Sequence, residues 1–347
     1  MSKTRVALDA MGADQGVAPV VRGAAELSMD ERHETEVVLV GDAHAIDREL
    51  RTHEHRRERL HIVDAPSFVS MDEKPKIGLD EKPDCSLLTA AELVRKGDAD
   101  VLVSAGNTGA VILGASRTFT RLPGVRRVAL AAVHPTVQSH GPKNDPFALM
   151  LDVGATLHCT ADDLVAFAVM GAAYSRVISD IECPRVGLLS NGSEPHKGTP
   201  AIVEAHGRLR QVGGFDFVGN VEGLDIPRGS CDVIVCEGFV GNIVLKMLEG
   251  VSEVAKELAR IAYGKRLRYK LALGMLSGGI KQIKELTDWK QYGGAPIVGF
   301  DHLVIKAHGR SNARAIRNAL KVAAKTVERR LVAQVREGLA QDQSARE

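Results

Sequence analysis

Short runs of apolar residues, many of them β-branched, alternate with longer helical patterns along almost the whole chain. Ten runs are predicted strands: residues 5–8, 36–40, 60–63, 100–103, 128–133, 147–151, 186–189, 215–218, 232–235 and 303–307. Most of them are apolar on both faces, which is typical of parallel strands covered by helices. Helical spacing is clearest at 161–178, 200–211 and 243–261. The alternation predicts an α/β fold with a doubly wound, mostly parallel sheet.

Composition narrows the class of protein. The 347 residues include 45 Lys and Arg against 44 Asp and Glu, so a polybasic nucleic-acid binder is not the default expectation. Five cysteines without a CxxC pair predict reduced thiols in a cytoplasmic, soluble protein. The apolar stretch 164–174 is too short to cross a bilayer, which needs about 20 residues. We expect a single domain over 1–340 and a polar tail over 341–347.

Five of the predicted strands end in loops that are rich in Gly, Asn, Ser and Asp. These loops are residues 9–14, 104–109, 152–155, 190–198 and 236–242. Ligands of open parallel sheets bind beyond the carboxyl ends of the strands, so we expect the five loops to form one site at one sheet edge. The alternative for any single loop is that its small residues merely supply a strand-to-helix turn.

The chemistry of these loops points to an oxyanion. Small residues before helix N-termini expose backbone N–H groups, and Lys197 adds a positive charge where a helix is predicted to begin at Thr199 and Pro200. The chain has no GxxxxGK[ST] phosphate loop, no GxGxxG after its first strand, no GxSxG elbow and no HExxH zinc motif. We therefore expect anion chemistry with no cofactor and no metal. Cys231 and Cys236 are predicted core thiols.

At these loops the sequence resembles the bacterial phosphate acyltransferases of phospholipid synthesis. The matching segments are 9–14 (DAMGAD), 104–110 (SAGNTGA), 236–242 (CEGFVGN), 292–296 (YGGAP) and 306–309 (KAHG). They occur in order between about residues 6 and 320. Three departures are Ala13 in place of the usual Gly, Glu237 in place of Asp, and a variant form of the Lys197 loop.

The resemblance implies a fold related to phosphotransacetylases and isocitrate dehydrogenases, with a protruding helical segment at about 261–290. It also implies a homodimer that transfers the acyl group of acyl-[acyl-carrier-protein] to inorganic phosphate, and the resulting acyl phosphate serves glycerol 3-phosphate acylation. Membership would place the protein peripherally at the inner face of the cytoplasmic membrane, near the downstream glycerol-phosphate acyltransferase.

The resemblance supports functional roles for two residues in particular. We expect Lys197 to hold phosphate and Asn242, after Gly241 at a predicted helix start, to donate its amide to phosphate or to the carbonyl oxygen. Further residues are predicted to bind phosphate or substrate: Asp9, Gly12, Asp14, Ser104, Gly106, Asn107, Thr108, Gly109, Asp152, Asn191, Gly198, Gly238, Gly241 and His308. Asp9 and Asp14 are expected to orient loop amides or a cationic side chain, because a free carboxylate repels phosphate.

A basic segment interrupts the strand–helix rhythm. Residues 261–284 carry six Lys or Arg, no Asp or Glu, and interleaved apolar side chains. The segment could form a dimer interface, lie on anionic lipid, or meet the acidic carrier protein. The residues predicted for this surface are Lys265, Arg266, Arg268, Lys270, Leu271 and Leu273.

Two other classes of function stay open at this point. A nicotinamide-dependent or decarboxylating dehydrogenase on a related scaffold needs a cofactor fingerprint and a cluster of metal-binding carboxylates. A non-catalytic scaffold for membrane lipid enzymes explains the basic segment and leaves the polar loops unexplained. A covalent acyl-enzyme is disfavoured, because no cysteine lies centrally in these loops with a paired histidine.

Overall fold

The computed structural model describes residues 3–264 and 293–344 and contains all ten predicted strands. The strands are β1 Thr4–Asp9, β2 Thr35–Gly41, β3 Leu60–Asp64, β4 Val101–Ser104, β5 Ala129–His140, β6 Asp145–Leu151, β7 Arg185–Leu189, β8 Asp216–Val221, β9 Val233–Val235, β10 Ala295–Val298 and β11 Leu303–Lys306. Strand β10 was not predicted. Its four residues include Pro296, and proline normally weakens a strand assignment.

The strands form one sheet in the order β3-β2-β1-β4-β11-β10-β5-β6-β9-β7-β8. The first parallel group is β3, β2, β1, β4 and β11, and the second is β6, β9, β7 and β8. Three antiparallel pairings through β10 and β5 separate them, so the two groups run in opposite directions. The sheet is therefore mostly parallel, as predicted.

The expectation that all five loops leave one sheet edge is wrong. The loops after β1 and β4 leave one edge, and those after β6, β7 and β9 leave the other. The reversal comes from a hairpin in which His140 of β5 pairs with Asp145 of β6. The sequence pattern shows the apolar inner parts of these two strands, while the polar outer part of the hairpin resembles a loop.

Helices cover both faces of the sheet. They are α1 Val17–Ser28, α2 Ala43–Leu50, α3 Pro75–Glu81, α4 Ser86–Lys96, α5 Thr108–Thr118, α6 Ala161–Ser179, α7 Pro200–Leu209, α8 Asp225–Arg228, α9 Gly238–Gly264, α12 Ala313–Glu328 and α13 Leu331–Ser344. Helices α1, α2, α6, α7, α12 and α13 share one buried apolar cluster, and α3, α4, α5, α8 and the start of α9 share the other. Val6 and Leu8 of β1 face the first cluster while Ala7 faces the second, as expected of a strand buried on both sides.

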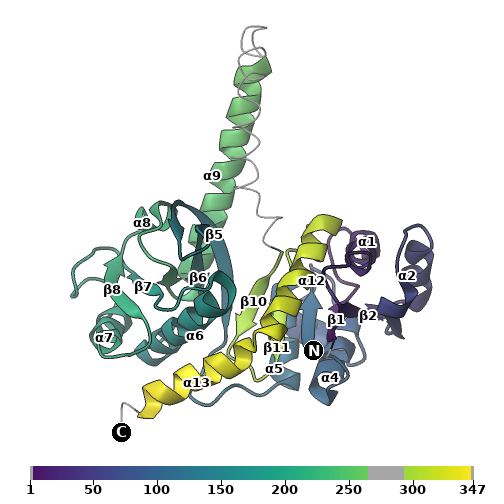
Figure 1. The fold of residues 1–347 in the computed structure, drawn as a ribbon, viewed down its shortest axis with the longest axis horizontal. Helices are drawn as coiled ribbons and strands as arrows, with labels where there is room; N and C mark the ends of the chain where they lie inside the picture. Colours follow the sequence, from purple (N-terminus) through teal and green to yellow (C-terminus); the bar gives the residue numbers. More distant parts are fainter. Residues whose placement is uncertain (1–2, 265–292, 345–347) are drawn as a thin grey trace.

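Helix α9 projects well beyond the sheet and its covering helices (Figure 1). Its first turns pack on the core through Val240, Val244 and Leu248. The residues predicted for the basic surface, Lys265 to Leu273, lie outside the described residues. No helix in the described part of the chain is long and apolar enough to cross a membrane. At the other end, α13 continues to Ser344, so residues 341–344 of the predicted tail are helical.

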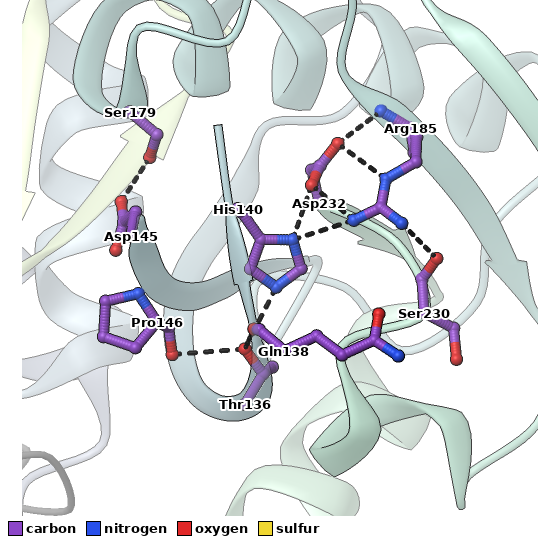
Figure 2. A network of polar contacts seen from close by, with 9 residues as sticks. All are labelled: Thr136, Gln138, His140, Asp145, Pro146, Ser179, Arg185, Ser230 and Asp232. Atoms are coloured by element: carbon purple, nitrogen blue, oxygen red, sulfur yellow. Dashed lines mark hydrogen bonds and ion pairs between the residues drawn. The ribbon is translucent and has the colours of Figure 1, made fainter. Parts of the chain in front are cut away.

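A buried polar network fixes the amino-terminal ends of β7 and β9 (Figure 2). His140 lies between Thr136 and Asp232, with 2.6 Å between its Nδ1 and the Asp232 carboxylate. Arg185 donates to the same carboxylate from its side chain and its backbone N–H. These groups lie opposite the carboxyl ends of β7 and β9, so the network holds the second parallel group together and is remote from its loops.

Candidate functional site

The loops after β1 and β4 meet at a buried aspartate. Asp9 accepts hydrogen bonds from Ser86 Oγ at 2.6 Å and from Ser104 Oγ at 2.7 Å. It also accepts from the backbone N–H of Met11 at 3.2 Å. Burial raises the pKa of Asp9, and these hydrogen bonds act in the opposite direction. Asp9 therefore orients a loop amide, as expected, together with two serine hydroxyls.

The loop after β11 packs against the loops after β1 and β4. The backbone N–H of Asp14 donates to the Gly309 carbonyl at 3.0 Å, and that of Ala307 donates to the Ser104 carbonyl at 2.9 Å. Gly12 has a φ of 73°, and a Cβ there would lie 3.4 Å from Gly106 Cα. Glycine is needed because the loops touch backbone to backbone.

Lys306 was not among the predicted site residues, and it lies at the centre of this cluster. It ends β11 next to Ser104, is buried, and its Nζ donates to the Ala307 carbonyl. Burial lowers its pKa to about 8, against the attraction of Asp9 and Asp14. The available signal was a lysine directly after a buried apolar strand, inside the KAHG segment.

His308 lies two residues beyond, half-buried. Its Nδ1 accepts a hydrogen bond from the backbone N–H of Arg310 at 3.1 Å, so the ring carries its proton on Nε2. Burial lowers the pKa of His308, and the nearby Lys246 of α9 lowers it further. A neutral imidazole with an Nε2–H is a hydrogen-bond donor at neutral pH.

Both the oxygen and the nitrogen of the Asn107 side-chain amide form hydrogen bonds with backbone groups of the protein. Its Oδ1 accepts from the Ala110 N–H and caps α5, and its Nδ2 donates to the carbonyls of Met71 and Glu73. The amide thus positions the loop. The first turn of α5, from Thr108 and Gly109, keeps the free backbone N–H groups that can bind an oxyanion.

Asp152 organises the loop after β6. Its carboxylate accepts from the backbone N–H groups of Leu130, Gly154, Ala155 and Thr156, and from the Thr156 hydroxyl. The side chain is fully buried, and burial raises its pKa while these bonds oppose the change. Asp152 therefore holds the loop in its conformation through these hydrogen bonds.

Helix α9 begins against this loop, at Gly238 rather than near Gly241 as predicted. A Cβ on Gly241 would lie 1.9 Å from the Asp152 carbonyl oxygen, and one on Gly238 would lie 2.4 Å from Asp152 Oδ2. The two glycines allow the helix to start in direct contact with the loop. Asn242 consequently lies in the second turn, exposed, with its Oδ1 3.7 Å from a Cβ built on Gly154.

One turn further along α9, the charge of Lys246 acts on two side chains of the first parallel group. Lys246 is exposed, contacts Glu249 at 2.8 Å, and lowers the pKa of both Lys306 and His308 after the larger effect of their burial. Five steps separate β4 from β9 in the sheet, and a twist of roughly 20–25° per step rotates the two groups by roughly 100–125°. Carboxyl ends of oppositely directed strands can therefore face the same helix.

The loop that carries Lys197 follows β7. The Lys197 N–H donates to the Glu194 carbonyl, which also accepts from Asn220 Nδ2 at 2.8 Å. Gly198 has a φ of 107°, and α7 begins at Pro200 after Thr199, as predicted. Lys197 is half-exposed and Asn191 is exposed. A pocket of about 570 Å³ separates this loop from the first turns of α9.

The five cysteines are free thiols. Cys231 and Cys236 are buried, as predicted for core thiols, and burial raises the pKa of both. Burial likewise raises the pKa of Cys159, to about 11. Within residues 3–264 and 293–344, no three His, Cys, Asp or Glu side chains gather to hold a metal ion.

The predicted residues thus form two assemblies, one in each parallel group. Asp9, Gly12, Asp14, Ser104 and Gly106 meet with Lys306 and His308 in the first parallel group. Asp152, Gly238, Gly241 and Asn242 meet in the second. Asn191 and Gly198 line the adjoining pocket beside Lys197. The arrangement offers cations, amides and helix N-termini to an anionic ligand.

Comparisons with known proteins show the family to which the chain belongs. Residues 4–334 match the family model described as fatty acid synthesis protein. The chain is 38% identical over 333 residues to the phosphate acyltransferase of Thermoanaerobacter pseudethanolicus, covering 96% of each chain. It is also 38% identical to the phosphate acyltransferase of Pelotomaculum thermopropionicum, over 96% of this chain and 95% of that one.

Solved structures share the fold at low sequence identity. The EutD phosphotransacetylase from Staphylococcus aureus aligns over 94% of both chains with a TM-score of 0.59 and 15% identity. A putative 4-hydroxythreonine-4-phosphate dehydrogenase from Salmonella typhimurium aligns over 94% of this chain and 99% of that chain, with a TM-score of 0.54 and 15% identity. The fold is therefore common to acyl-transferring and dehydrogenating enzymes, and it does not separate the two.

Proposed function

The chain belongs to the phosphate acyltransferase family of fatty acid synthesis proteins, and we propose that it transfers a fatty acyl group from acyl-[acyl-carrier-protein] to inorganic phosphate. The acyl phosphate then serves the acylation of glycerol 3-phosphate in phospholipid synthesis. The observation that carries the proposal is the position of α9, whose Asn242 lies beside Gly154 of the Asp152 loop and whose Lys246 acts electrostatically on Lys306 and His308, lowering the pKa of both.

The reaction requires a site that holds phosphate close to the thioester carbon and stabilises the negative charge that develops. A hydrogen phosphate oxygen attacks the thioester carbon from about 3 Å, the new C–O bond forms, and the C–S bond of the tetrahedral intermediate breaks. The proton of hydrogen phosphate passes to the departing thiolate, so the products are acyl phosphate and the free carrier-protein thiol. Lys197 and Lys306 reduce the repulsion between the phosphate and the developing oxyanion, and Asn242 donates its amide to one of them.

The test is formation of acyl phosphate by the purified chain from acyl-carrier-protein thioester and phosphate, followed by mass spectrometry. Lys197→Ala and Asn242→Ala should each lower turnover at least about tenfold, or 1.4 kcal/mol, with the fold intact. Lys96→Ala, an exposed lysine of α4, is the matched control. Normal rates in folded variants reject these two roles, and absence of acyl phosphate in the wild type rejects the reaction.

The exposed stripe of α9 supports a homodimer. Its apolar residues recur every three or four positions: Ile243, Met247, Val251, Val254, Leu258 and Ile261, each about half exposed or more. A continuous apolar helix face of this length is typical of an interface, and a second copy buries it by pairing the same helix. Val254→Glu with Leu258→Glu should convert the dimer to a monomer in sedimentation equilibrium, whereas Glu253→Gln should not. An unchanged mass would reject this interface.

The basic segment supports peripheral contact with an anionic membrane, where the downstream acyltransferase takes up the product. Each basic residue near such a surface contributes about 1 kcal/mol, and neighbouring leucines insert shallowly. Leu271→Glu with Leu273→Glu should reduce sedimentation with anionic liposomes while activity in solution is retained. Unchanged liposome binding would remove the membrane proposal.

A further inference from the structure

The pocket between the Lys197 loop and α9 has two chemically different parts. Its interior walls are apolar side chains of β7, α6, α7 and α9, including Leu164, Leu188, Ile202, Val240 and Val244. Its polar lining comes from the ends of the loops, where Ser190, Asn191 and Thr199 lie. With about 570 Å³ of space, it is within the range of small-molecule sites.

The charge of the lining argues against phosphate inside this pocket. In the described part of the chain, Glu237 is the one ionisable carboxylate among the lining residues, and no Lys or Arg is found there. The thiols of Cys159 and Cys236 also line it, and burial raises the pKa of both, which keeps them neutral. The carboxylate repels an oxyanion. The apolar walls cannot replace the hydration of a charged group, so they favour an uncharged alkyl group.

The pocket adjoins the loop that carries Lys197. Asn191 and Gly198 line it on either side of Lys197 in the sequence. On α9, Val240 and Val244 share the face that lines the pocket, whereas Asn242, two residues from each of them, lies on another face of the helix. A ligand in the pocket therefore has its outer end at the Lys197 loop.

We propose that this pocket, bounded by β7, α6, α7 and the first turns of α9, holds the alkyl chain of the acyl donor. The thioester group then lies at the mouth, with phosphate on the side of Lys197. The inference rests on the proposed function and specifies its acyl subsite. Each buried methylene favours binding about fourfold, so the pocket makes the rate depend on chain length.

The test narrows the pocket without touching the residues assigned to the chemistry. Ala201 of α7 lines the pocket and is only partly buried, so Ala201→Phe places a ring in the open space. Val203 lies two residues on, is 36% exposed and does not line the pocket, so Val203→Phe is the matched control. Turnover is measured with octanoyl, dodecanoyl and hexadecanoyl carrier-protein thioesters.

We expect Ala201→Phe to lower turnover of the hexadecanoyl thioester at least about tenfold relative to the octanoyl thioester, with Val203→Phe unchanged. If Ala201→Phe keeps the wild-type chain-length profile, the pocket is not the acyl subsite, while the phosphorolysis itself stands.

If the wild type forms no acyl phosphate from any thioester, the proposed function fails separately. Binding of hexadecanoyl pantetheine, measured by calorimetry, then tests whether the pocket holds the alkyl chain. Binding lost in Ala201→Phe and kept in Val203→Phe supports the subsite, and equal binding by both variants overturns it.

Discussion

Replacing Lys306 with methionine is expected to stabilise the fold while it impairs the reaction. The Lys306 residue is only 6% exposed at the end of β11, where few groups solvate its ammonium. Burial lowers its pKa from 10.5 to about 8, although Asp9 and Asp14 act in the opposite direction. One pKa unit corresponds to about 1.4 kcal/mol, so the charged form costs about 3 kcal/mol of folding free energy at pH 7.

The pH dependence has a definite sign. Between pH 8 and 10.5 the unfolded chain still holds the Lys306 proton while the folded chain has released it, so stability rises with pH. Below pH 8 Lys306 is protonated in both the folded and the unfolded chain, and the full free-energy cost of burying its charge remains. Methionine removes the charge at similar length, and it also removes the hydrogen bond to Ala307. The variant should therefore be about 1–3 kcal/mol more stable at pH 7, a difference that closes as the pH approaches 10.5.

Urea denaturation at pH 7 and pH 9.5 measures this difference, and Lys96→Met on the surface is the control, expected within about 0.5 kcal/mol of the wild type. Turnover of Lys306→Met should fall at least about tenfold, because a cation of the site is lost. A variant that is less stable at pH 7, or whose stability difference does not change with pH, would show that the buried charge of Lys306 does not destabilise the fold. Normal turnover would remove Lys306 from the site.

Two further predictions concern the second parallel group. Burial raises the pKa of Asp232, but hydrogen bonds from His140 and Arg185 outweigh it and lower the pKa to about 2. Asp232→Asn should therefore cost about 2 kcal/mol in urea denaturation at pH 7, a difference that narrows as the pH falls from about 4 toward 2; an equal cost at every pH would contradict this. Gly241→Ala should displace the first turns of α9 from Asp152 and lower turnover at least about tenfold. Gly250→Ala on the same helix, where a Cβ meets nothing within 4 Å, should leave turnover unchanged, and equal rates in both would show that the close contact is not needed.

Periodicity was sufficient to predict ten strands, because buried parallel strands must be apolar on both faces. It also predicted the helices at 161–178, 200–211 and 243–261, which correspond to α6, α7 and most of α9. It could not give strand direction, which depends on the hairpin ending at His140 and Asp145. It also missed β10, where Pro296 conceals a short antiparallel strand.

The candidate site was predictable where small residues follow a strand, as at Gly12, Gly106 and Gly241. It was less predictable where the same polar residue type can either bind a ligand or hold backbone groups of the protein. Asn107 and Asp152 have the polarity of ligand-binding residues, and the structure uses both to hold backbone groups. Lys306 was overlooked because a lysine at a strand end is ordinarily solvated, and only the packing of three loops buries it.

Direct attack of phosphate on the thioester is tested by the release of free carrier-protein thiol, measured with and without phosphate. With phosphate, direct attack predicts one thiol released for each acyl phosphate formed. Without phosphate, it predicts no release and no change in the mass of the protein, because Cys159 and Cys236 are held as neutral thiols. A burst of thiol without phosphate, with an acyl group added to the protein, would show a covalent acyl-enzyme and contradict direct attack.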